Sequence, residues 1–190
     1  MTKHPPRPRI YLAGPDLFMP DCAQRYERLK AECDQQGLCG LAPSDADVPA
    51  DFNGGDDERA RHICAANLER IRNADAVLAN LCSFRGLEPD SGTVFEVGYA
   101  VALGKPVAAY GVPEGTYASR VAAARICTSD AQGVLRERDT GTLVEGLGQR
   151  LNLMLTGSMV LHDSSARAAA WLSRALRSSG GAVDSAAHLR

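Results

Sequence analysis

The alternation of short apolar runs with helix-forming segments constrains this chain most strongly. Between Arg9 and Gly111, runs rich in Val, Leu, Ile and Ala are typical of buried strands, and the segments between them carry apolar residues at helical spacing. The expected strands are 9–13, 37–42, 75–81 and 105–111. The expected helices are 21–36, 58–73 and 91–103, with Asp21 and Ser91 as N-caps and Gly37 and Gly104 as stops. This order predicts an α/β fold, a doubly wound, flavodoxin-like parallel sheet of about five strands with helices on both faces.

The remainder of the chain is less regular. Residues 43–57 are rich in Asp, Gly and Pro and are expected to form an exposed loop, and loops of this length often cover a site. A fifth strand is expected within 125–129 and a helix over 142–155. Beyond Gly157, apolar residues at helical spacing favour one more helix before a frayed or disordered end at 178–190. We therefore expect one domain over residues 1–157 and a C-terminal helical extension with a flexible tail over 158–190.

The composition argues against several function classes. A chain of 190 residues can bury a core without disulfides or metals, and a formal net charge of −2 offers no basic surface to a nucleic acid polymer. The six cysteines include no CxxC pair, so we expect reduced thiols and no metal site. No apolar stretch approaches the ~20 residues that a membrane helix needs, and the N-terminus does not fit a signal peptide. These features predict a cytoplasmic protein with neither a membrane nor a nucleic acid polymer as partner.

Two loops follow the carboxyl ends of the first and third expected strands, where open sheets of this type bind ligands. They are 14–20 and 81–90, and the second leads into the helix that carries Glu96. Apolar residues surround Glu96, and glycines at 92 and 98 leave space beside it. A carboxylate there costs free energy unless it is paired or used, and the nearby helix N-terminus favours its ionised, nucleophilic form. Glu96 is therefore a candidate nucleophile; the alternative is a solvent-facing glutamate on an amphipathic helix.

Three further residues have an ordinary structural interpretation beside a functional one. Asp90 stands just before the helix of Glu96 and suits a capping role. Asp75 stands at the start of the third strand and suits a strand edge. Tyr11 lies inside the first strand, where an aromatic residue is commonly core, although its hydroxyl needs a partner if buried. Only together with Glu96 do these residues indicate a catalytic site.

Four segments of the sequence resemble the nucleoside 2-deoxyribosyltransferases. They are RIYLAGPDLF, NLERIRNADAVLANLCSFRG, DSGTVFEVGYAVALGKPV and, further on, LNLML. The similarity is continuous over Arg9 to Pro106 and returns near Asn152, and the order and spacing of the four segments together make it specific. The resemblance implies small-molecule partners, a deoxynucleoside and a free nucleobase, and no cofactor.

The resemblance also implies catalytic roles. Glu96 matches the catalytic nucleophile of the family, and Tyr11 matches the tyrosine that hydrogen-bonds and orients it. Asp75 and Asp90 match two aspartates that handle base protonation and contacts to base or sugar.

Substrate contacts are implied at two further places. Asn152 and Met154 match residues that reach into the neighbouring subunit's pocket, which implies a homo-oligomer with shared active sites. The family often has an acidic residue before this run, where the present chain has Leu151. The remaining expected contacts are Gly14, Pro15, Asp16, Phe18 and Gly92.

The implied reaction follows the logic of retaining glycosidases. Glu96 attacks C1′ of the deoxyribose to give a covalent glycosyl-enzyme, and an aspartic acid, Asp75 first and Asp90 second, protonates the departing base. A nucleotide N-glycosidase is the close alternative, with Arg85, Ser91 and Ser119 as candidate phosphate ligands. A nucleotide-binding module without catalysis is a third hypothesis, and the presence of all four candidate catalytic residues argues against it.

Overall fold

A five-stranded parallel sheet forms the centre of the protein. In this computed structural model, residues 6–43, 48 and 52–179 are described. The strands, in their order across the sheet, are β2 (Cys39–Leu41), β1 (Arg9–Ala13), β3 (Ala76–Asn80), β4 (Val107–Tyr110) and β7 (Val160–Leu161). All four neighbouring pairs are parallel. This order confirms the predicted flavodoxin-like sheet, whose strand order reverses between β1 and β3.

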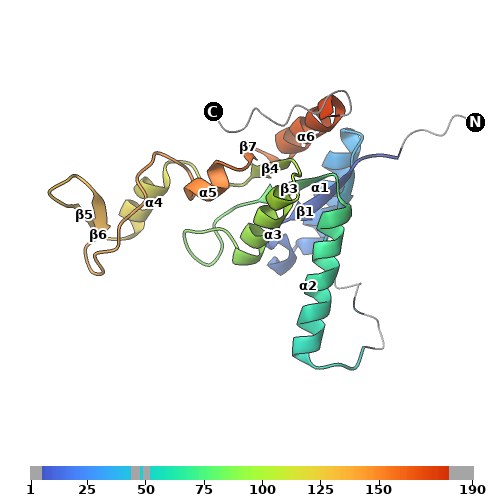
Figure 1. Cartoon of the computed structure of the whole chain (residues 1–190), viewed down its shortest axis with the longest axis horizontal. Coiled ribbons are helices and arrows are strands. Elements are labelled where there is room, and N and C mark those ends of the chain that lie inside the picture. The colour runs from blue at the N-terminus through green and yellow to red at the C-terminus, as the bar shows by residue number, and fades with distance from the viewer. Residues whose placement is uncertain (1–5, 44–47, 49–51, 180–190) are drawn as a thin grey trace, which may run out of the picture.

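Helices cover both faces of the sheet, as expected (Figure 1). The helices are η1 (Pro15–Phe18), α1 (Cys22–Gln35), α2 (Asp56–Asn73), α3 (Ser91–Ala102), α4 (Tyr117–Ala124), α5 (Leu153–Thr156) and α6 (Ser165–Ser179). The α1 and α6 helices pack on one face, and α2 and α3 pack on the other. Within the described residues, no helix has the length and apolar character needed to cross a bilayer.

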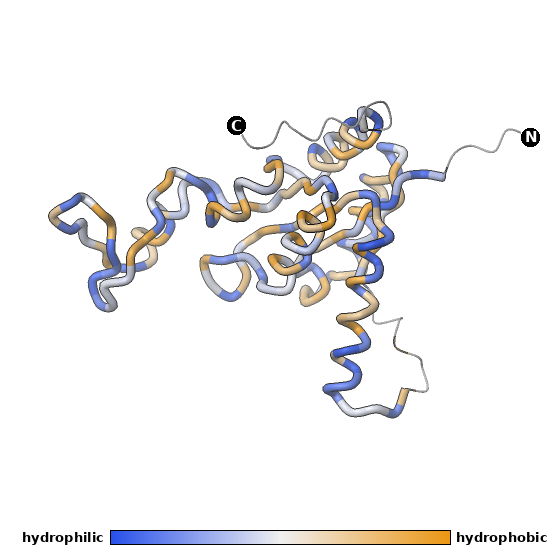
Figure 2. Tube along the Cα trace, in the orientation of Figure 1, coloured by the Kyte–Doolittle hydropathy of each residue, from blue (hydrophilic) through white to orange (hydrophobic). Residues whose placement is uncertain are grey.

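Alternate residues of β1 enter the two halves of the core, because successive side chains of a strand point to opposite faces. Ile10 and Leu12 pack with α1 and α6, while Tyr11 and Ala13 pack with α2 and α3. The β3 strand is buried along its whole length, as its continuous apolar sequence predicts. In Figure 2 the central strands are largely hydrophobic, whereas much of the N-terminal half of α2, away from the sheet, is hydrophilic. The core therefore fixes the backbone on which the candidate site is built.

The predicted helix ends are partly right. Gly37 and Gly104 follow α1 and α3 with φ of +73° and +68°, so both act as the predicted stops. Asp21 occupies the N-cap position of α1, but its side chain bonds Arg25 instead of the backbone. The cap of α3 is Asp90, for which a capping role was expected, and not Ser91. A side chain can cap only if the backbone aims it at the first turn, and at α3 this geometry belongs to the residue one position earlier.

The segment between β4 and β7 departs most from expectation. The strand predicted within 125–129 exists as β5 (Cys127–Ser129), but it forms an antiparallel hairpin with β6 (Leu135–Glu137) outside the main sheet. Figure 1 shows this hairpin and α4 projecting away from the sheet. Two of the three β5 residues are exposed, which does not suit the interior of a parallel sheet. The hairpin is therefore an arm and not the fifth strand.

The helix predicted over 142–155 is wrong except for its last residues, Leu153–Thr156. Gly141 and Gly148 adopt φ of +70° and +72°, which are not helical values. Leu143 instead pairs with Arg136 in an isolated antiparallel bridge. The glycines thus override the apolar spacing that had suggested a helix.

The C-terminal segment contributes to the sheet and the core. The two residues of β7 pair with Ala108 and Ala109 of β4, and α6 packs its apolar stripe on the face shared with α1. The predicted helix around Trp171 is confirmed, and it includes Ser178 and Ser179, which had been expected to fray. The rest of that expected tail, and residues 44–47 and 49–51 of the loop expected at 43–57, lie outside the described residues. Asp56 and Asp57, the last two residues of that expected loop, belong instead to α2.

Candidate active site

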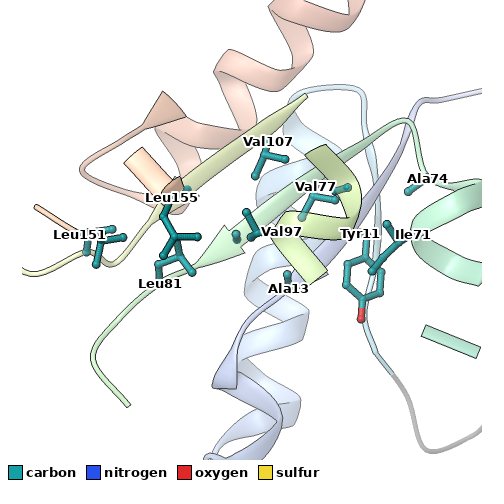
Figure 3. Packing of buried hydrophobic residues seen from close by; sticks show 14 residues of the cluster. Tyr11, Ala13, Ile71, Ala74, Val77, Leu81, Val97, Val107, Leu151 and Leu155 are labelled. Atoms are coloured by element: carbon teal, nitrogen blue, oxygen red, sulfur yellow. The ribbon is translucent and has the colours of Figure 1, made fainter. Parts of the chain in front are cut away.

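Tyr11 and Glu96 meet on the α3 side of the sheet. The Tyr11 hydroxyl donates a hydrogen bond to Oε1 of Glu96 at 2.5 Å, joining β1 to the middle of α3. In Figure 3 the Tyr11 ring lies among the apolar residues of the core, with its hydroxyl at the edge of that cluster. The two side chains are far apart in sequence, so the pair depends on the fold. The structure thus gives the hydroxyl the partner that its burial requires.

The environment of Glu96 makes its carboxylate more basic than usual. Burial raises the pKa of Glu96 from 4.5 to about 7, and the negative charge of Asp90 acts in the same direction. The hydrogen bond from Tyr11 opposes both effects. The pKa of Tyr11 is itself raised, first by burial and then by Glu96, so its hydroxyl stays protonated and remains a donor. A partly desolvated carboxylate that ionises near neutral pH is suited to nucleophilic attack.

Asp90 is both a cap and a neighbour of Glu96. Its Oδ2 accepts hydrogen bonds from the backbone amide of Thr93 at 2.9 Å and from the Thr93 hydroxyl at 3.0 Å. These bonds fix the carboxyl group at the N-terminus of α3, where its charge acts on Glu96. Within the described residues no such bond uses the other oxygen, Oδ1. Asp90 therefore has one oxygen for the cap and one for a further partner.

The fold does not bring Asp75 close to Tyr11 and Glu96. Its Oδ2 accepts from the backbone amide of Arg9 at 2.6 Å, and its own amide donates to the Arg9 carbonyl at 2.7 Å. Arg9 is the first residue of β1, so this pair lies at the amino-terminal edge of the sheet. The carboxyl end of β1 is four residues away, roughly 13 Å along a strand. The structure therefore supports a strand-edge role for Asp75 and no contact with the reacting groups.

The loop after β1 is fixed by a buried polar network. Oδ2 of Asp16 accepts from the Asn80 amide at 2.8 Å, and Oδ1 accepts from Arg25 at 3.2 Å. A Cβ on Gly14 would come within 2.8 Å of both Asn80 and Asp16, so only glycine fits there. Asp16 and Pro15 are buried. The carboxyl group of Asp16 therefore stabilises the turn, and we assign it no contact with a ligand.

Phe18 is the exposed member of the same turn. It is 58% exposed, and its ring stacks on that of Phe84, from the loop after β3, with centroids 5.4 Å apart. Both loops follow the carboxyl ends of their strands, so the aromatic pair lies at the edge of the sheet where a ligand is expected. Phe18 is among the substrate contacts expected from the sequence, and Phe84 is not.

Asn152 and Met154 lie on the other side of α3 from Glu96. They line an apolar groove of about 520 Å³ together with Val94 and Gly98 of α3. Because a helix turns by about 100° per residue, Glu96 points roughly 160° away from those two positions. Asn152 caps α5 and donates to Glu145 at 2.9 Å, so an acidic group does contact this run although Leu151 is core. Met154 is 72% exposed. Neither residue reaches the Glu96 of its own chain.

The remaining sequence candidates are dispersed. Gly92 lies exposed in the first turn of α3, next to Oδ2 of Asp90. Ser91 lines the apolar groove, while Ser119 lies in α4 and bonds to Thr116. Arg85 lies over the Phe84 ring. The three candidate phosphate ligands, Arg85, Ser91 and Ser119, therefore occupy three different environments.

Asn67 is a polar residue that sequence analysis did not select. It lies one turn before Ile71 on the same side of α2, and Ile71 packs with Tyr11. The Oδ1 atom of Asn67 is buried and has no hydrogen-bond partner among the described residues. A buried acceptor without a partner carries a desolvation penalty unless a ligand or water satisfies it. In the sequence, the signal that could have identified Asn67 is a side-chain amide within the apolar stripe of a helix.

Comparison with known proteins defines the family. The family model described as nucleoside 2-deoxyribosyltransferase matches residues 10–154. The chain belongs to the nucleoside 2-deoxyribosyltransferase family. A solved structure of a family member, 2-desoxiribosyltransferase from Leishmania mexicana, is similar with a TM-score of 0.67 and 30% identity, covering 88% of this chain and 97% of that one. These matches confirm the resemblance found in the sequence.

Two other relatives extend this picture of the deoxyribosyltransferase fold. A conserved protein from Enterococcus faecalis V583 has a TM-score of 0.56 at 20% identity, covering 89% of this chain and 99% of that chain, which shows the fold alone. An uncharacterized protein of Schizosaccharomyces pombe is 27% identical over 161 residues, 79% of this chain and 76% of its own length.

Proposed function

We propose that this protein is a nucleoside 2-deoxyribosyltransferase that exchanges the base of 2′-deoxynucleosides through a deoxyribosyl–Glu96 intermediate. The observation that carries the proposal is the partly buried carboxylate of Glu96, which accepts a hydrogen bond from the Tyr11 hydroxyl at 2.5 Å. The hydrogen bond fixes the orientation of the carboxylate, and its basicity keeps it reactive near neutral pH. Family membership supplies the substrate class, a deoxynucleoside and a nucleobase.

The reaction runs in two displacements. An oxygen of Glu96 forms a bond to C1′ while the C1′–N bond breaks, and the bonding pair leaves with the base nitrogen. The departing base nitrogen takes up a proton, and Asp90, whose Oδ1 has no hydrogen bond within the described residues, is the group that the geometry favours for carrying it. An incoming base then attacks C1′, the C1′–O bond to Glu96 breaks with its electron pair returning to the carboxylate, and the N–H proton of the base passes to Asp90. Two inversions restore the original β configuration.

The site is completed by a second copy of the chain. Asn152 and Met154 face away from their own Glu96 and are accessible beside an apolar groove, so they are placed to serve a neighbouring protomer. A homo-oligomer with shared sites follows. Analytical ultracentrifugation at assay concentration tests this: a fully active monomer would contradict the shared site.

Base exchange is the direct assay of the proposal. Incubating the protein with a 2′-deoxynucleoside and a different free base should yield the exchanged β-nucleoside, measured by chromatography and proton NMR. The matching 5′-monophosphate, with and without acceptor base, is the comparison. Release of free base from the monophosphate without exchange would identify a nucleotide N-glycosidase instead, and absence of any reaction with either substrate would leave a binding module.

Tyr11→Phe should shift the pH dependence of the reaction. The Tyr11 hydrogen bond lowers the pKa of Glu96, so its loss raises that pKa further above about 7. Because attack requires the ionised carboxylate, the acid limb of the kcat/KM profile should move to higher pH, with a lower rate at neutral pH. Tyr110→Phe is the control, since Tyr110 packs on the opposite face of the sheet. An unmoved acid limb in Tyr11→Phe would refute the orienting role.

A further inference from the structure

A cation lies on the aromatic pair at the edge of the candidate site. The Arg85 guanidinium is 4.8 Å from the centroid of Phe84 and 5.9 Å from that of Phe18. The two rings are themselves stacked, 28° from parallel. Three side chains from two loops thus form one layered surface, defined here as the Phe18–Phe84–Arg85 platform. Phe18 remains largely exposed, so a flat ligand can still reach it.

The backbone holds Arg85 in an unusual conformation. Among the described residues, Arg85 is the one non-glycine residue with positive φ, at 54°. The loop is closed by a hydrogen bond from the Phe84 amide to the Glu88 carbonyl at 2.9 Å. Left-handed backbone is unfavourable for a residue with a Cβ and is retained where the surrounding structure needs it. The loop therefore accepts local strain and places this side chain on the platform.

The guanidinium keeps its donors available. Within the described part of the chain, the Arg85 side chain has neither a carboxylate partner nor a hydrogen bond, and its contacts are with the two rings. A guanidinium carries five N–H donors and no acceptor, so it can recognise only groups that accept. Two adjacent acceptors in one plane match its fork best.

We propose that Arg85 selects the base, reading the O6 and N7 acceptors of a 6-oxopurine that stacks on the Phe18–Phe84–Arg85 platform. This inference rests on the proposed function and narrows its substrates to nucleosides such as 2′-deoxyinosine and 2′-deoxyguanosine. Among the common bases, only a 6-oxopurine offers two adjacent acceptors on that edge. Adenine places an amino donor beside N7, and this donor opposes the guanidinium. Pyrimidines have no N7.

The surroundings of Arg85 favour a base over a phosphate. Aromatic faces stack nucleobases irrespective of sequence, and the Arg85 guanidinium is already part of such a stack. A 5′-phosphate site usually gathers further donors, yet Ser91 lines the groove on the far side of α3 and Ser119 belongs to α4. The Arg85 guanidinium is therefore assigned to recognition of the base and not of a 5′-phosphate.

Binding to a protein that cannot turn over separates recognition from chemistry. In the Glu96→Ala background, titration calorimetry with 2′-deoxyinosine and 2′-deoxyadenosine should give at least about 10-fold tighter binding of 2′-deoxyinosine. Adding Arg85→Lys keeps the charge and removes the fork, and the preference should fall to near one. Arg85→Gly, which accepts the positive φ without strain, should give the same loss if the lysine variant folds poorly. Arg138→Lys, on the projecting hairpin arm, should leave the preference intact.

Three results would overturn the inference. They are equal affinity for the two nucleosides, a preference that survives both Arg85 variants, and binding of 2′-deoxyinosine 5′-monophosphate that is much tighter than that of the nucleoside and depends on Arg85. Failure of both nucleosides to bind would also reject it. Base exchange by the wild-type protein tests the proposed function separately. If the protein exchanges bases but shows no preference for oxopurines, the role of Arg85 is rejected and the proposed function stands.

Discussion

Glu96→Ala is expected to reduce base exchange by roughly three orders of magnitude or more, because it removes the carboxylate that the proposed mechanism uses to form the covalent bond to C1′. The neighbouring carboxylate, Asp90, is fixed by its cap to Thr93 and cannot move into the place of Glu96. Nucleoside binding should persist, since the rest of the pocket is unchanged. Glu114→Ala, an exposed carboxylate elsewhere, should retain full activity. Near-normal exchange by Glu96→Ala would reject the nucleophile.

The isosteric variant separates loss of chemistry from loss of fold. Burial raises the pKa of Glu96 from 4.5 to about 7, so the folded protein binds this proton more tightly than the unfolded chain does. The stability associated with that proton is present below pH 4.5 and is lost as pH rises through about 7. Glu96→Gln should therefore be as stable as wild type at pH 4 and more stable at pH 8, while remaining inactive. Chemical denaturation at the two pH values measures this.

The intermediate itself can be located. Denaturing the protein during turnover with a deoxynucleoside and no acceptor base should leave a deoxyribosyl mass on the peptide that contains Glu96. Glu96→Ala should carry no such adduct. A deoxyribosyl group on any other residue would require a different mechanism, whatever the activity of the variants.

The Tyr11–Glu96 pair was predictable from sequence because two kinds of information agreed. Tyr11 lies in a strand whose apolar sequence indicates burial, and Glu96 is a carboxylate among the apolar residues of a helix. The family resemblance indicated that these two residues act together. Asp75 shows what a motif alone leaves open. The resemblance gave Asp75 a catalytic role although it stands at the start of its strand, which is the amino edge of a parallel sheet. The β1–β3 register, with Ile10 opposite Ala76, puts it there beside Arg9.

Contacts between distant segments were the least predictable part of the site. Asn80 is an ordinary strand residue in sequence, and its bond to Asp16 exists only because β1 and β3 are neighbours. The fifth strand, β7, has two residues, too few for any periodic signal. Phe84 and Phe18 likewise stack only after both loops have been placed. Local patterns identified the elements, and the pairing of the elements created the network.

Asp16→Ala should destabilise the protein by about 1–3 kcal/mol, the usual effect of leaving a buried hydrogen-bonding group without its partner. The substitution leaves the Asn80 side-chain amide without its partner and removes one of the two carboxylates that accept from Arg25. It also frees the turn that carries Phe18, so oxopurine preference should fall together with stability. The free energy of unfolding, from denaturant titration, and the nucleoside binding ratio are the two measurements.

Asp21→Ala is the matched control, because Asp21 pairs with the same Arg25. The Asp21 side chain is 48% exposed, whereas that of Asp16 is 3% exposed. Water replaces an exposed partner at little cost, so the Asp21 variant should unfold at nearly the wild-type denaturant midpoint. Equal effects of the two substitutions would mean that Arg25, and not the burial of Asp16, sets the stability of the turn. The large difference that we expect instead would assign Asp16 to positioning the site rather than to touching the substrate.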